Sequence, residues 1–249
     1  MKAFLIAAGI GTRLKPYTEM IPKCLVPIQG KPLLEIWLEL LDKYQIEAVL
    51  INIHHHAEKI DEFVAGIKKS VRVKITTFYE QNLLGSGGTV LANREFVADS
   101  DEFMIAYADN LTTVNLFKMI CFHRIIRLKG GILTMGLIHS PNPKDCGIVV
   151  MDQENKIVKF IEKPQNPVGN LANSGIYIAS KEIFELLPKP QSNDKNDAID
   201  MGFDILPALI GKMYGYEIKE YLRDIGTIES YHKALEEWPQ TDVARNNEY

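Results

Sequence analysis

Short apolar runs alternate with amphipathic helical segments along the first half of this chain, and this alternation constrains the fold more than any other feature. The run 3–8 is apolar throughout and precedes a glycine, which is typical of a strand buried on both faces of a sheet. The order βαβαβ with short connections favours a mostly parallel, Rossmann-like α/β sheet flanked by helices. We predict strands at 3–8, 48–53, 73–79 and 103–108 and helices at 33–44, 58–69 and 116–128.

The second half reads differently, because strand-like segments follow one another with little helix between them. Turn-forming residues separate them at 144–147 and 152–155. We therefore expect a small mixed or antiparallel extension of the sheet, and a single domain over 1–238 with halves at 1–130 and 131–238. In the second half we predict strands at 131–138, 147–151, 157–161, 172–178 and 216–222, helices at 183–187, 203–213 and 228–237, a polar, mobile loop at 188–200 and a disordered polar tail at 239–249.

Composition excludes several classes of protein. Hydrophobic residues make up 46% and charged residues 24% of the 249 residues, so disordered and collagen-like chains are excluded. The formal net charge of −4 lacks the basic footprint of a nucleic-acid-binding protein. The apolar start of the chain is too short for a signal peptide or a membrane span, and no later window is long enough. We expect a cytoplasmic protein with neither nucleic acid nor a membrane as partner.

The cysteines indicate no metal or disulfide framework. Cys24, Cys121 and Cys146 are odd in number, widely spaced and without a Cys-x-x-Cys pair. We interpret them as reduced thiols that fill apolar space.

Four unusual segments follow predicted strands, at 9–13, 82–88, 108–110 and 223–226. Because ligands of open parallel sheets bind beyond the carboxyl ends of the strands, we expect these segments to converge on one edge of the sheet. The first of them, Gly9-x-Gly11-Thr12-Arg13, offers backbone N–H groups and a guanidinium to an anion. It is neither the dinucleotide fingerprint, since Leu14 stands at the third glycine position, nor a Walker A loop. We read it as a phosphate-binding loop rather than a simple tight turn.

Three charged residues complete the expected site. Lys23 lies between Pro22 and Cys24, and the proline stiffens the backbone that carries the lysine. Asp109 and Asp224 end predicted strands, where aspartate also serves as a turn cap. Two carboxylates beside a phosphate loop form a site for Mg²⁺, which takes a few carboxylates together with substrate oxygens.

Other polar or aromatic residues leave alternatives open. The run His54–His56 is either a metal site or, as we favour, the polar exit of a strand, since only alternate residues share a face. The segment Tyr79–Gln81 either contributes an amide to a base edge or ends a strand. We interpret Trp37 and Trp238 as packing anchors.

The segment 157–164 carries an adjacent carboxylate and ammonium. An apolar strand precedes Glu162 and Lys163, and Pro164 ends it. Adjacent residues on a strand point to opposite faces, yet a bend at the proline could turn both side chains toward one pocket. The alternative is an exposed ion pair.

Together these motifs resemble the sugar-1-phosphate nucleotidyltransferases, also called nucleotide-diphospho-sugar pyrophosphorylases. The resemblance spans about residues 1–238, and one small departure is Ala8, where many relatives have glycine. The family's C-terminal β-helix or acyltransferase domain is absent from this sequence. The motifs are Gly9-x-Gly-Thr-Arg13-Leu, Pro22-Lys23, Leu84-Gly-Ser-Gly-Gly88, Asp109, Glu162-Lys163-Pro164, Asn173-x-Gly175-x-Tyr177 and Asp224-x-Gly226-Thr227.

The resemblance implies a reaction and a role for each matched residue. A sugar 1-phosphate attacks the α-phosphorus of a nucleoside triphosphate in line, pyrophosphate leaves, and Mg²⁺ assists. The half 1–130 then binds the nucleotide and the half 131–238 the sugar. The implied nucleotide-binding residues are Ala8, Gly9, Gly11, Thr12, Arg13, Gln81, Gly85 and Ser86. The implied catalytic residues are Arg13, Lys23 and Asp109, the metal ligands Asp109 and Asp224, and the sugar-phosphate-binding residues Gly147, Glu162, Lys163 and Asn173.

The overall likeness is greatest to short guanylyltransferases for mannose or heptose 1-phosphate, so we expect GTP as donor. Thymidylyl-, uridylyl- or cytidylyltransferases for other sugar phosphates are the alternatives within the class. A non-catalytic regulatory relative and, more remotely, a nicotinamide oxidoreductase are alternatives outside it. The sequence is compatible with a homo-oligomer and does not determine it.

Overall fold

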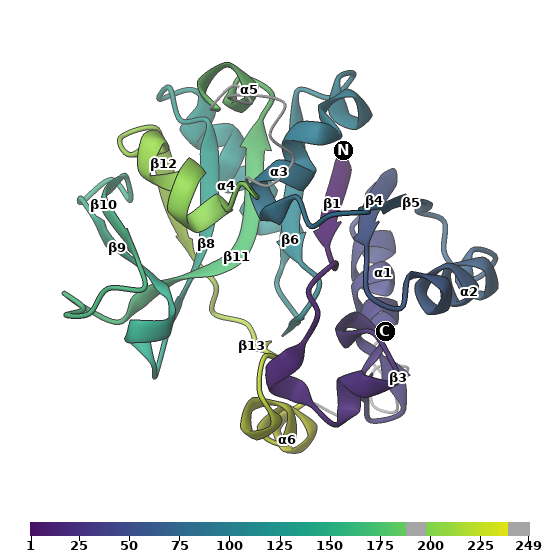
Figure 1. Cartoon of the computed structure of the whole chain (residues 1–249). Coiled ribbons are helices and arrows are strands. Elements are labelled where there is room, and N and C mark those ends of the chain that lie inside the picture. Colours follow the sequence, from purple (N-terminus) through teal and green to yellow (C-terminus); the bar gives the residue numbers. More distant parts are fainter. Residues whose placement is uncertain (188–197, 239–249) are drawn as a thin grey trace, which may run out of the picture.

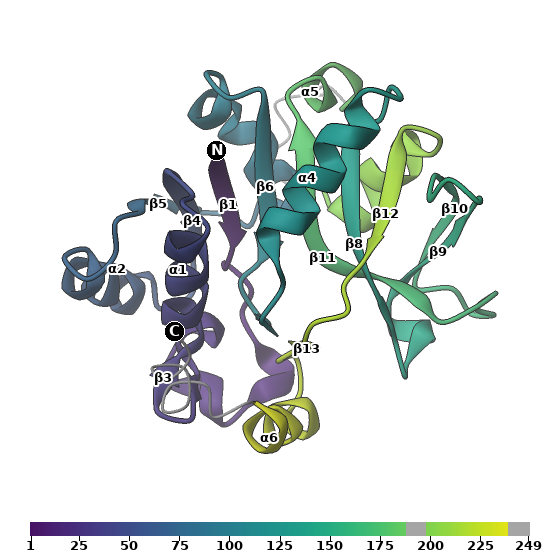
Figure 2. The same cartoon turned by 180° about the vertical axis from the view of Figure 1, so that it is seen from behind.

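A twisted nine-stranded sheet, covered by helices on both faces, forms the body of the molecule in a computed structural model that describes residues 1–187 and 198–238 (Figures 1 and 2). Its strands are β1 (Lys2–Ile6), β4 (Ala48–Ile53), β5 (Lys74–Tyr79), β6 (Glu102–Tyr107), β8 (Leu133–His139), β9 (Gly147–Met151), β10 (Ile157–Glu162), β11 (Leu171–Ser180) and β12 (Met213–Glu217). Two small ribbons pair β2 (Pro27–Ile28) with β3 (Lys31–Pro32), and β7 (Asn110–Thr112) with β13 (Leu222–Asp224). The helices are α1 (Leu33–Lys43), α2 (Ala57–Ile67), α3 (Gly85–Ala92), α4 (Leu116–Arg127), α5 (Ile183–Leu186) and α6 (Ile228–Glu237).

The first half of the chain forms the parallel part of the sheet, in the order β5-β4-β1-β6. Alternate residues of β1 face opposite layers, as the strand period requires. Leu5 faces the apolar core under α1, α2, α4 and α6, whereas Phe4 packs with the core under α3 and α5. Both are fully buried, so the prediction of a parallel sheet covered on both faces is confirmed.

The second half adds the antiparallel extension. The long strand β11 runs antiparallel to β6 on one edge and to β8 on the other, and β12 continues the sheet parallel to β8. Beyond β6, the same β11 pairs with β9, which carries β10 as a hairpin partner. Figure 1 shows this β9–β10 arm standing away from the parallel sheet, at the left. It carries Gly147 and Glu162, two of the residues predicted to bind the sugar phosphate.

Two expectations for the second half are wrong in detail. Instead of one helix over 203–213, a π-helical turn spans Met201–Ile205, a 3₁₀ turn spans Leu206–Leu209, and β12 begins at Met213. Pro207 lacks the N–H that a continuing helix needs. The strand expected at 216–222 is divided between β12 and β13, which belong to different sheets.

The remaining calls on the chain concern its loops and ends. The tail 239–249 lies outside the described residues, as does the polar loop 188–200 except for its last three residues. Among the helices that the structure describes, none has the length and apolar character needed to cross a membrane.

Candidate active site

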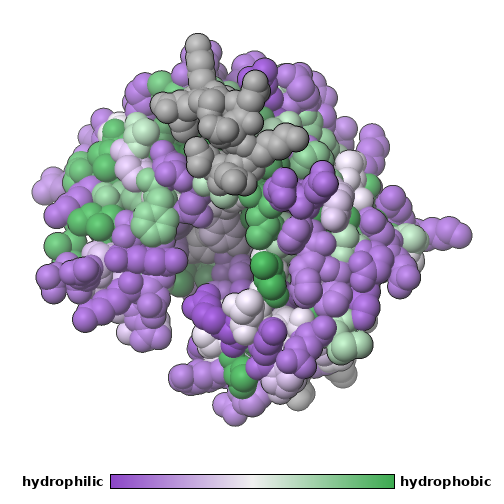
Figure 3. Space-filling model, in the orientation of Figure 1, coloured by the Kyte–Doolittle hydropathy of each residue, from purple (hydrophilic) through white to green (hydrophobic). Residues whose placement is uncertain are grey.

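The carboxyl ends of the central strands meet in a small cavity of about 120 Å³. It lies where β1 and β6 end, and Figure 3 shows a hollow bordered mainly by hydrophilic side chains on the same face. Three of the predicted site residues therefore share one cavity, namely Gly9, Lys23 and Asp109. The lining consists of Ile6, Ala7, Gly9, Lys23, Cys24, Tyr107 and Asp109.

Lys23 lies between the two predicted metal ligands. Its ammonium donates to the Asp109 carboxylate and lies 3.6 Å from Oδ1 of Asp224. Asp224 reaches this position from the β13–β7 ribbon, in which it is paired with Asn110, and the N–H of Ile225 donates to the Asp109 carbonyl at 2.9 Å. Asp224 thus belongs to an added ribbon, and the expectation that it ends a strand of the main sheet is wrong, although it lies at the expected place.

The charges of this cluster are imperfectly balanced. Burial alone would lower the pKa of Lys23, but the carboxylates of Asp109 and Asp224 outweigh it and raise that pKa, so the lysine is held as an ammonium. Loss of water and repulsion from Asp109 raise the pKa of Asp224 despite the nearby Lys23 and Arg13. Asp109 and Asp224 therefore repel each other across the single ammonium that lies between them.

This donor set suits a divalent cation. Carboxylate oxygens from two elements converge at the edge of the cavity, and an added positive charge would relieve their repulsion. Among residues 1–187 and 198–238, no cluster of three or more His, Cys, Asp or Glu side chains has the geometry of a complete metal cage. Mg²⁺ needs no such cage, because it keeps waters and substrate oxygens in its shell. The residues present fit the expected ion.

The phosphate loop follows β1 as expected. Gly11 has φ +70°, and an added Cβ there would lie 2.9 Å from the Thr18 side chain, whose hydroxyl donates to the Gly11 carbonyl at 2.7 Å. A Cβ at Gly9 would meet open space, so packing does not require that glycine. Thr12 and Arg13 form an exposed 3₁₀ turn with Leu14 beside the cavity, and the Arg13 charge acts on both Lys23 and Asp224. The loop thus presents free backbone and one guanidinium to solvent.

The segment 82–88 follows β5 as expected, and from Gly85 onward it forms the start of α3. Gly85 has φ +78°, and a Cβ there would lie 2.4 Å from the carbonyl oxygen of Ile199. A Cβ at Gly87 would lie 2.4 Å from the Ile205 side chain. Glycine is a poor helix former, so packing against the distant segment around Ile199 overrides its propensity.

A buried polar network, which the sequence analysis missed, holds the nucleotide half together. The Asn52 side chain accepts from the N–H of Ala7 at 2.6 Å and donates to Glu80 at 2.9 Å. The Glu80 carboxylate also accepts from the Thr89 hydroxyl at 2.5 Å and from the N–H of Leu84 at 3.0 Å. The network joins the ends of β1, β4 and β5 to α3, and a buried strand carrying Asn52 was the one signal available for it.

The outcome for Tyr79–Gln81 follows from this network. Glu80 is 2% exposed and serves as the structural anchor of the segment. The next residue, Gln81, is exposed, whereas Ala8, the other residue predicted to lie near the base, is buried.

The residues predicted to bind the sugar phosphate lie on or directly after the strands of the β9–β10–β11 arm. Glu162 is paired with Gly147 across the β10–β9 ladder, so close that a Cβ on the glycine would lie 2.5 Å from the carboxylate. Lys163 has φ +45°, and this bend brings its Nζ to 5.8 Å from the Phe203 ring centroid. On β11, the Asn173 amide donates to the Tyr177 hydroxyl at 2.6 Å. The bend expected at Pro164 therefore occurs one residue earlier.

Two of the three histidines, His54 and His56, bind backbone carbonyls, and the His55 ring lies beside that of His56. Nδ1 of His54 lies 2.8 Å from the Glu80 carbonyl, and Nε2 of His56 lies 3.0 Å from the Glu19 carbonyl. This geometry agrees with the polar strand exit that we favour. Trp37 is buried and donates to the Asn110 carbonyl at 2.7 Å, as a packing anchor should.

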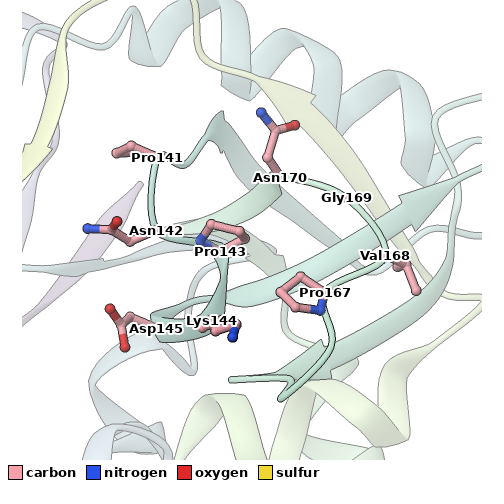
Figure 4. A pocket seen from close by; sticks show the side chains of 9 residues that line it. All are labelled: Pro141, Asn142, Pro143, Lys144, Asp145, Pro167, Val168, Gly169 and Asn170. Atoms are coloured by element: carbon pink, nitrogen blue, oxygen red, sulfur yellow. The ribbon is translucent and has the colours of Figure 1, made fainter.

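A larger groove than this cavity lies elsewhere. It encloses about 910 Å³ at the far end of the antiparallel extension, between the loops that follow β8 and β10 (Figure 4). None of the predicted site residues lines it; the lining residues are Pro141, Asn142, Pro143, Lys144, Asp145, Pro167, Val168, Gly169 and Asn170. Size alone therefore does not locate the charged centre.

Comparison with known proteins identifies the family. Residues 2–241 match the family described as nucleotidyl transferase, which is nearly the whole chain. The chain belongs to the nucleotidyl transferase family. This nucleotidyl transferase is similar to the UTP–glucose-1-phosphate uridylyltransferase of Synechocystis sp., with 32% identity over 94% of the chain and 62% of that protein. It is 29% identical to the catalytic subunit beta of mannose-1-phosphate guanylyltransferase from Dictyostelium discoideum, over 91% of the chain and 61% of that protein.

The chain thus spans about three fifths of the length of these curated relatives. Among solved structures, HddC from Yersinia pseudotuberculosis shares 26% identity and a TM-score of 0.76, covering 95% of this chain and 99% of that one. A Bacillus anthracis protein assigned as a glucose-1-phosphate thymidylyltransferase superposes with a TM-score of 0.83 at 20% identity, covering 100% of this chain and 97% of that one. The predicted fold and the resemblance to sugar-1-phosphate nucleotidyltransferases are confirmed.

Proposed function

We propose that this nucleotidyl transferase joins a nucleoside triphosphate to a sugar 1-phosphate and releases pyrophosphate. The observation that carries the proposal is the cluster of Lys23, Asp109 and Asp224 at the edge of the sheet cavity, beside the Gly9–Arg13 loop. Phosphoryl transfer needs positioned positive charge and a metal site more than a covalent intermediate, and this cluster offers both.

Each part of the cluster has a distinct task in this proposal. Backbone N–H groups of Ala8, Gly9, Gly11 and Thr12 receive phosphate oxygens, and the exposed Arg13 guanidinium holds the triphosphate. Lys23, kept charged by its two carboxylate neighbours, stabilises the negative charge that builds up around the α-phosphorus. Asp109 and Asp224 would hold Mg²⁺, which supplies charge neutralisation between the triphosphate oxygens.

The acceptor side rests on the β9–β10–β11 arm. Glu162 accepts no hydrogen bond from the residues that the structure describes, so both of its oxygens are available to sugar hydroxyls. Lys163 presents an ammonium suited to a monoester phosphate. Asn173 and the backbone at Gly147 complete the acceptor site, while Gln81, Gly85 and Ser86 border the nucleoside.

GTP is our proposed donor. The structure of HddC, which this chain matches end to end at 26% identity, was determined in complex with GMP-PN. A mannose-1-phosphate guanylyltransferase subunit is among the curated relatives at 29% identity, although a uridylyltransferase is more similar at 32%. We propose a mannose- or heptose-type 1-phosphate as acceptor, and a uridylyl, thymidylyl or cytidylyl donor as the alternative.

The alternative outside the class is a regulatory relative that binds nucleotide sugar without turnover. The polar set disfavours it, because Arg13, Lys23, Asp109, Lys163 and Asp224 are all present. A site that no longer catalyses the reaction would be expected to have lost some of these charged side chains.

Pyrophosphate release across a grid of triphosphates and sugar 1-phosphates, with Mg²⁺, tests both levels of the proposal. We expect turnover, with GTP favoured by at least about tenfold, equivalent to about 1.4 kcal/mol. Turnover that favours dTTP or UTP would reject GTP and keep the reaction class. Binding of nucleotide sugar without any turnover would reject the class.

A further inference from the structure

The segment Ile199–Phe203 lies between the nucleotide half and the sugar arm. The N–H of Ile199 donates to the Leu84 carbonyl at 2.8 Å, and the Ile199 carbonyl accepts from Gly87 at 2.8 Å and Gly88 at 3.0 Å. These three backbone hydrogen bonds hold the segment against the start of α3. Ile199 also packs closely against Gly85, as described above, at the same place.

Asp200 links the same segment to the π-helical turn Met201–Ile205 that follows it. Its Oδ2 accepts from the Ser86 hydroxyl at 3.1 Å, and Ser86 Oγ accepts in turn from the N–H of Met201 at 2.9 Å. Its Oδ1 accepts from the N–H groups of Gly202 at 2.8 Å and Phe203 at 3.1 Å. One carboxylate therefore binds Ser86 and caps the π-helical turn Met201–Ile205. Such turns are rare in proteins, and those that occur are often found at functional sites.

The same turn touches the sugar arm at its other side. A Cβ on Gly202 would lie 2.6 Å from Oε2 of Glu162, and the Phe203 ring lies beneath Lys163 as described above. The Asp200 charge also reaches Glu162: loss of water is the main cause that raises the pKa of Glu162, and repulsion by Asp200 adds to it. The turn thus contacts both residues that we assign to the sugar phosphate.

We propose that Asp200, through the turn that it caps, couples the triphosphate site to the sugar 1-phosphate site. Asp200 is a positioning residue that holds Ser86 on one side and sets Gly202 and Phe203 against Glu162 and Lys163 on the other. Each substrate then tightens the binding of the other by the same factor, because coupling between two sites is reciprocal. The inference rests on the proposed nucleotidyl transfer.

Calorimetric titration with α,β-methylene-GTP and mannose 1-phosphate tests the coupling, because the methylene bridge prevents transfer. For the wild-type protein with Mg²⁺, we expect the sugar phosphate to tighten analogue binding by at least about fivefold. In Asp200→Ala this factor should fall below about twofold, while the analogue alone binds within about threefold of wild type. Asp200→Asn keeps an oxygen for the cap and should restore part of the coupling.

A matched control variant and a second test variant show whether the loss of coupling is specific to Asp200 and the turn that it caps. Asp152 accepts from the N–H groups of Glu154 and Lys156 at 2.9 Å each in the β9–β10 turn, so Asp152→Ala removes a similar cap and should leave the coupling unchanged. Gly202→Ala, which displaces Glu162, should weaken binding of the sugar phosphate alone, reduce the coupling and spare binding of the analogue. This variant tests the coupling even if Asp200→Ala fails to fold.

Two results would overturn the inference: a wild-type protein that binds both ligands independently, or full coupling retained in Asp200→Ala and Gly202→Ala. Failure of the proposed function is recognised separately. In that case the wild-type protein releases no pyrophosphate anywhere in the substrate grid. If another donor is fastest in that grid, its α,β-methylene analogue replaces that of GTP.

Discussion

Two glutamates, one in each half of the molecule, show how differently the halves are built. Glu80 is 2% exposed, and its carboxylate accepts from Asn52, Leu84 and Thr89. Glu162 is half-buried on the arm and accepts no hydrogen bond from the described residues. Satisfied buried polar groups rigidify a structure, whereas a desolvated carboxylate without a donor is left for a ligand to satisfy. The first half of the chain is thus pre-organised around Glu80, whereas under the proposed function the Glu162 carboxylate gains its partner only when a substrate binds.

The largest expected effect lies at the junction of the halves. Asp109→Asn should lower turnover by at least about a hundredfold, because it removes charge stabilisation at the metal site. Folding should persist, since Asp109 lies at an open cavity edge. Pyrophosphate release and circular dichroism measure the two effects, with Asp152→Asn as the control. Near-normal turnover in Mg²⁺ would remove Asp109 from the metal site.

The next effect would sharpen the view of the nucleotide half as a rigid scaffold. Asn52→Leu leaves the N–H of Ala7 without its acceptor and removes one of the two donors to Oε1 of Glu80, which should lower the free energy of unfolding by about 2 kcal/mol. Denaturant unfolding measures this. Asn170→Leu, at an exposed position on the other half, should change stability by less than about 0.5 kcal/mol. Equal losses in the two variants would contradict the contrast between the halves.

A third change separates the substrates. Lys163→Ala should raise the KM for sugar 1-phosphate about tenfold and leave triphosphate affinity nearly unchanged, because only the acceptor phosphate loses a cation. Glu162→Ala should in addition weaken discrimination among sugars. Steady-state kinetics beside calorimetry measures both, with the exposed Lys159→Ala on the same strand as control. Comparable losses for both substrates would mean that Lys163 does not bind the sugar phosphate.

The smallest expected effect concerns pH. Burial and Asp200 raise the pKa of Glu162, so its carboxylate is lost at a higher pH than for an ordinary glutamate. As pH falls through this raised pKa, the KM for sugar 1-phosphate should rise, by about twofold where half of the carboxyl groups are protonated. The folded protein binds this proton more tightly than the unfolded chain does. Its free energy of unfolding should therefore decrease as pH rises through the same pKa, over the range in which sugar binding improves.

Glu162→Gln is the control for the pH experiment, because the phosphate monoester itself titrates near pH 6. The difference between the two profiles isolates Glu162. Identical profiles would show that its ionisation does not affect sugar binding.

Local pattern was sufficient for the parallel half of the fold. The strands 3–8, 48–53, 73–79 and 103–108 were predicted nearly at their observed bounds, because continuous apolar runs and amphipathic helices have different periods. The predicted site residues at strand ends, Gly9 and Asp109 among them, follow from the rule that ligands bind beyond those ends, whereas Lys23 was predicted from its own segment beside Pro22. The sequence by itself therefore determined the sheet, its ligand-binding edge and the kinds of charge gathered there.

Tertiary structure alone decided how distant segments complete the site. Asp224 arrives on a ribbon with β7, Gly85 begins a helix because of Ile199, and Glu80 is held by Asn52 from a neighbouring strand. No periodic pattern in the sequence predicts these contacts, because each joins residues far apart in the chain by packing or hydrogen bonding. Local propensity is a weak preference, and the free energy of such long-range contacts overrides it.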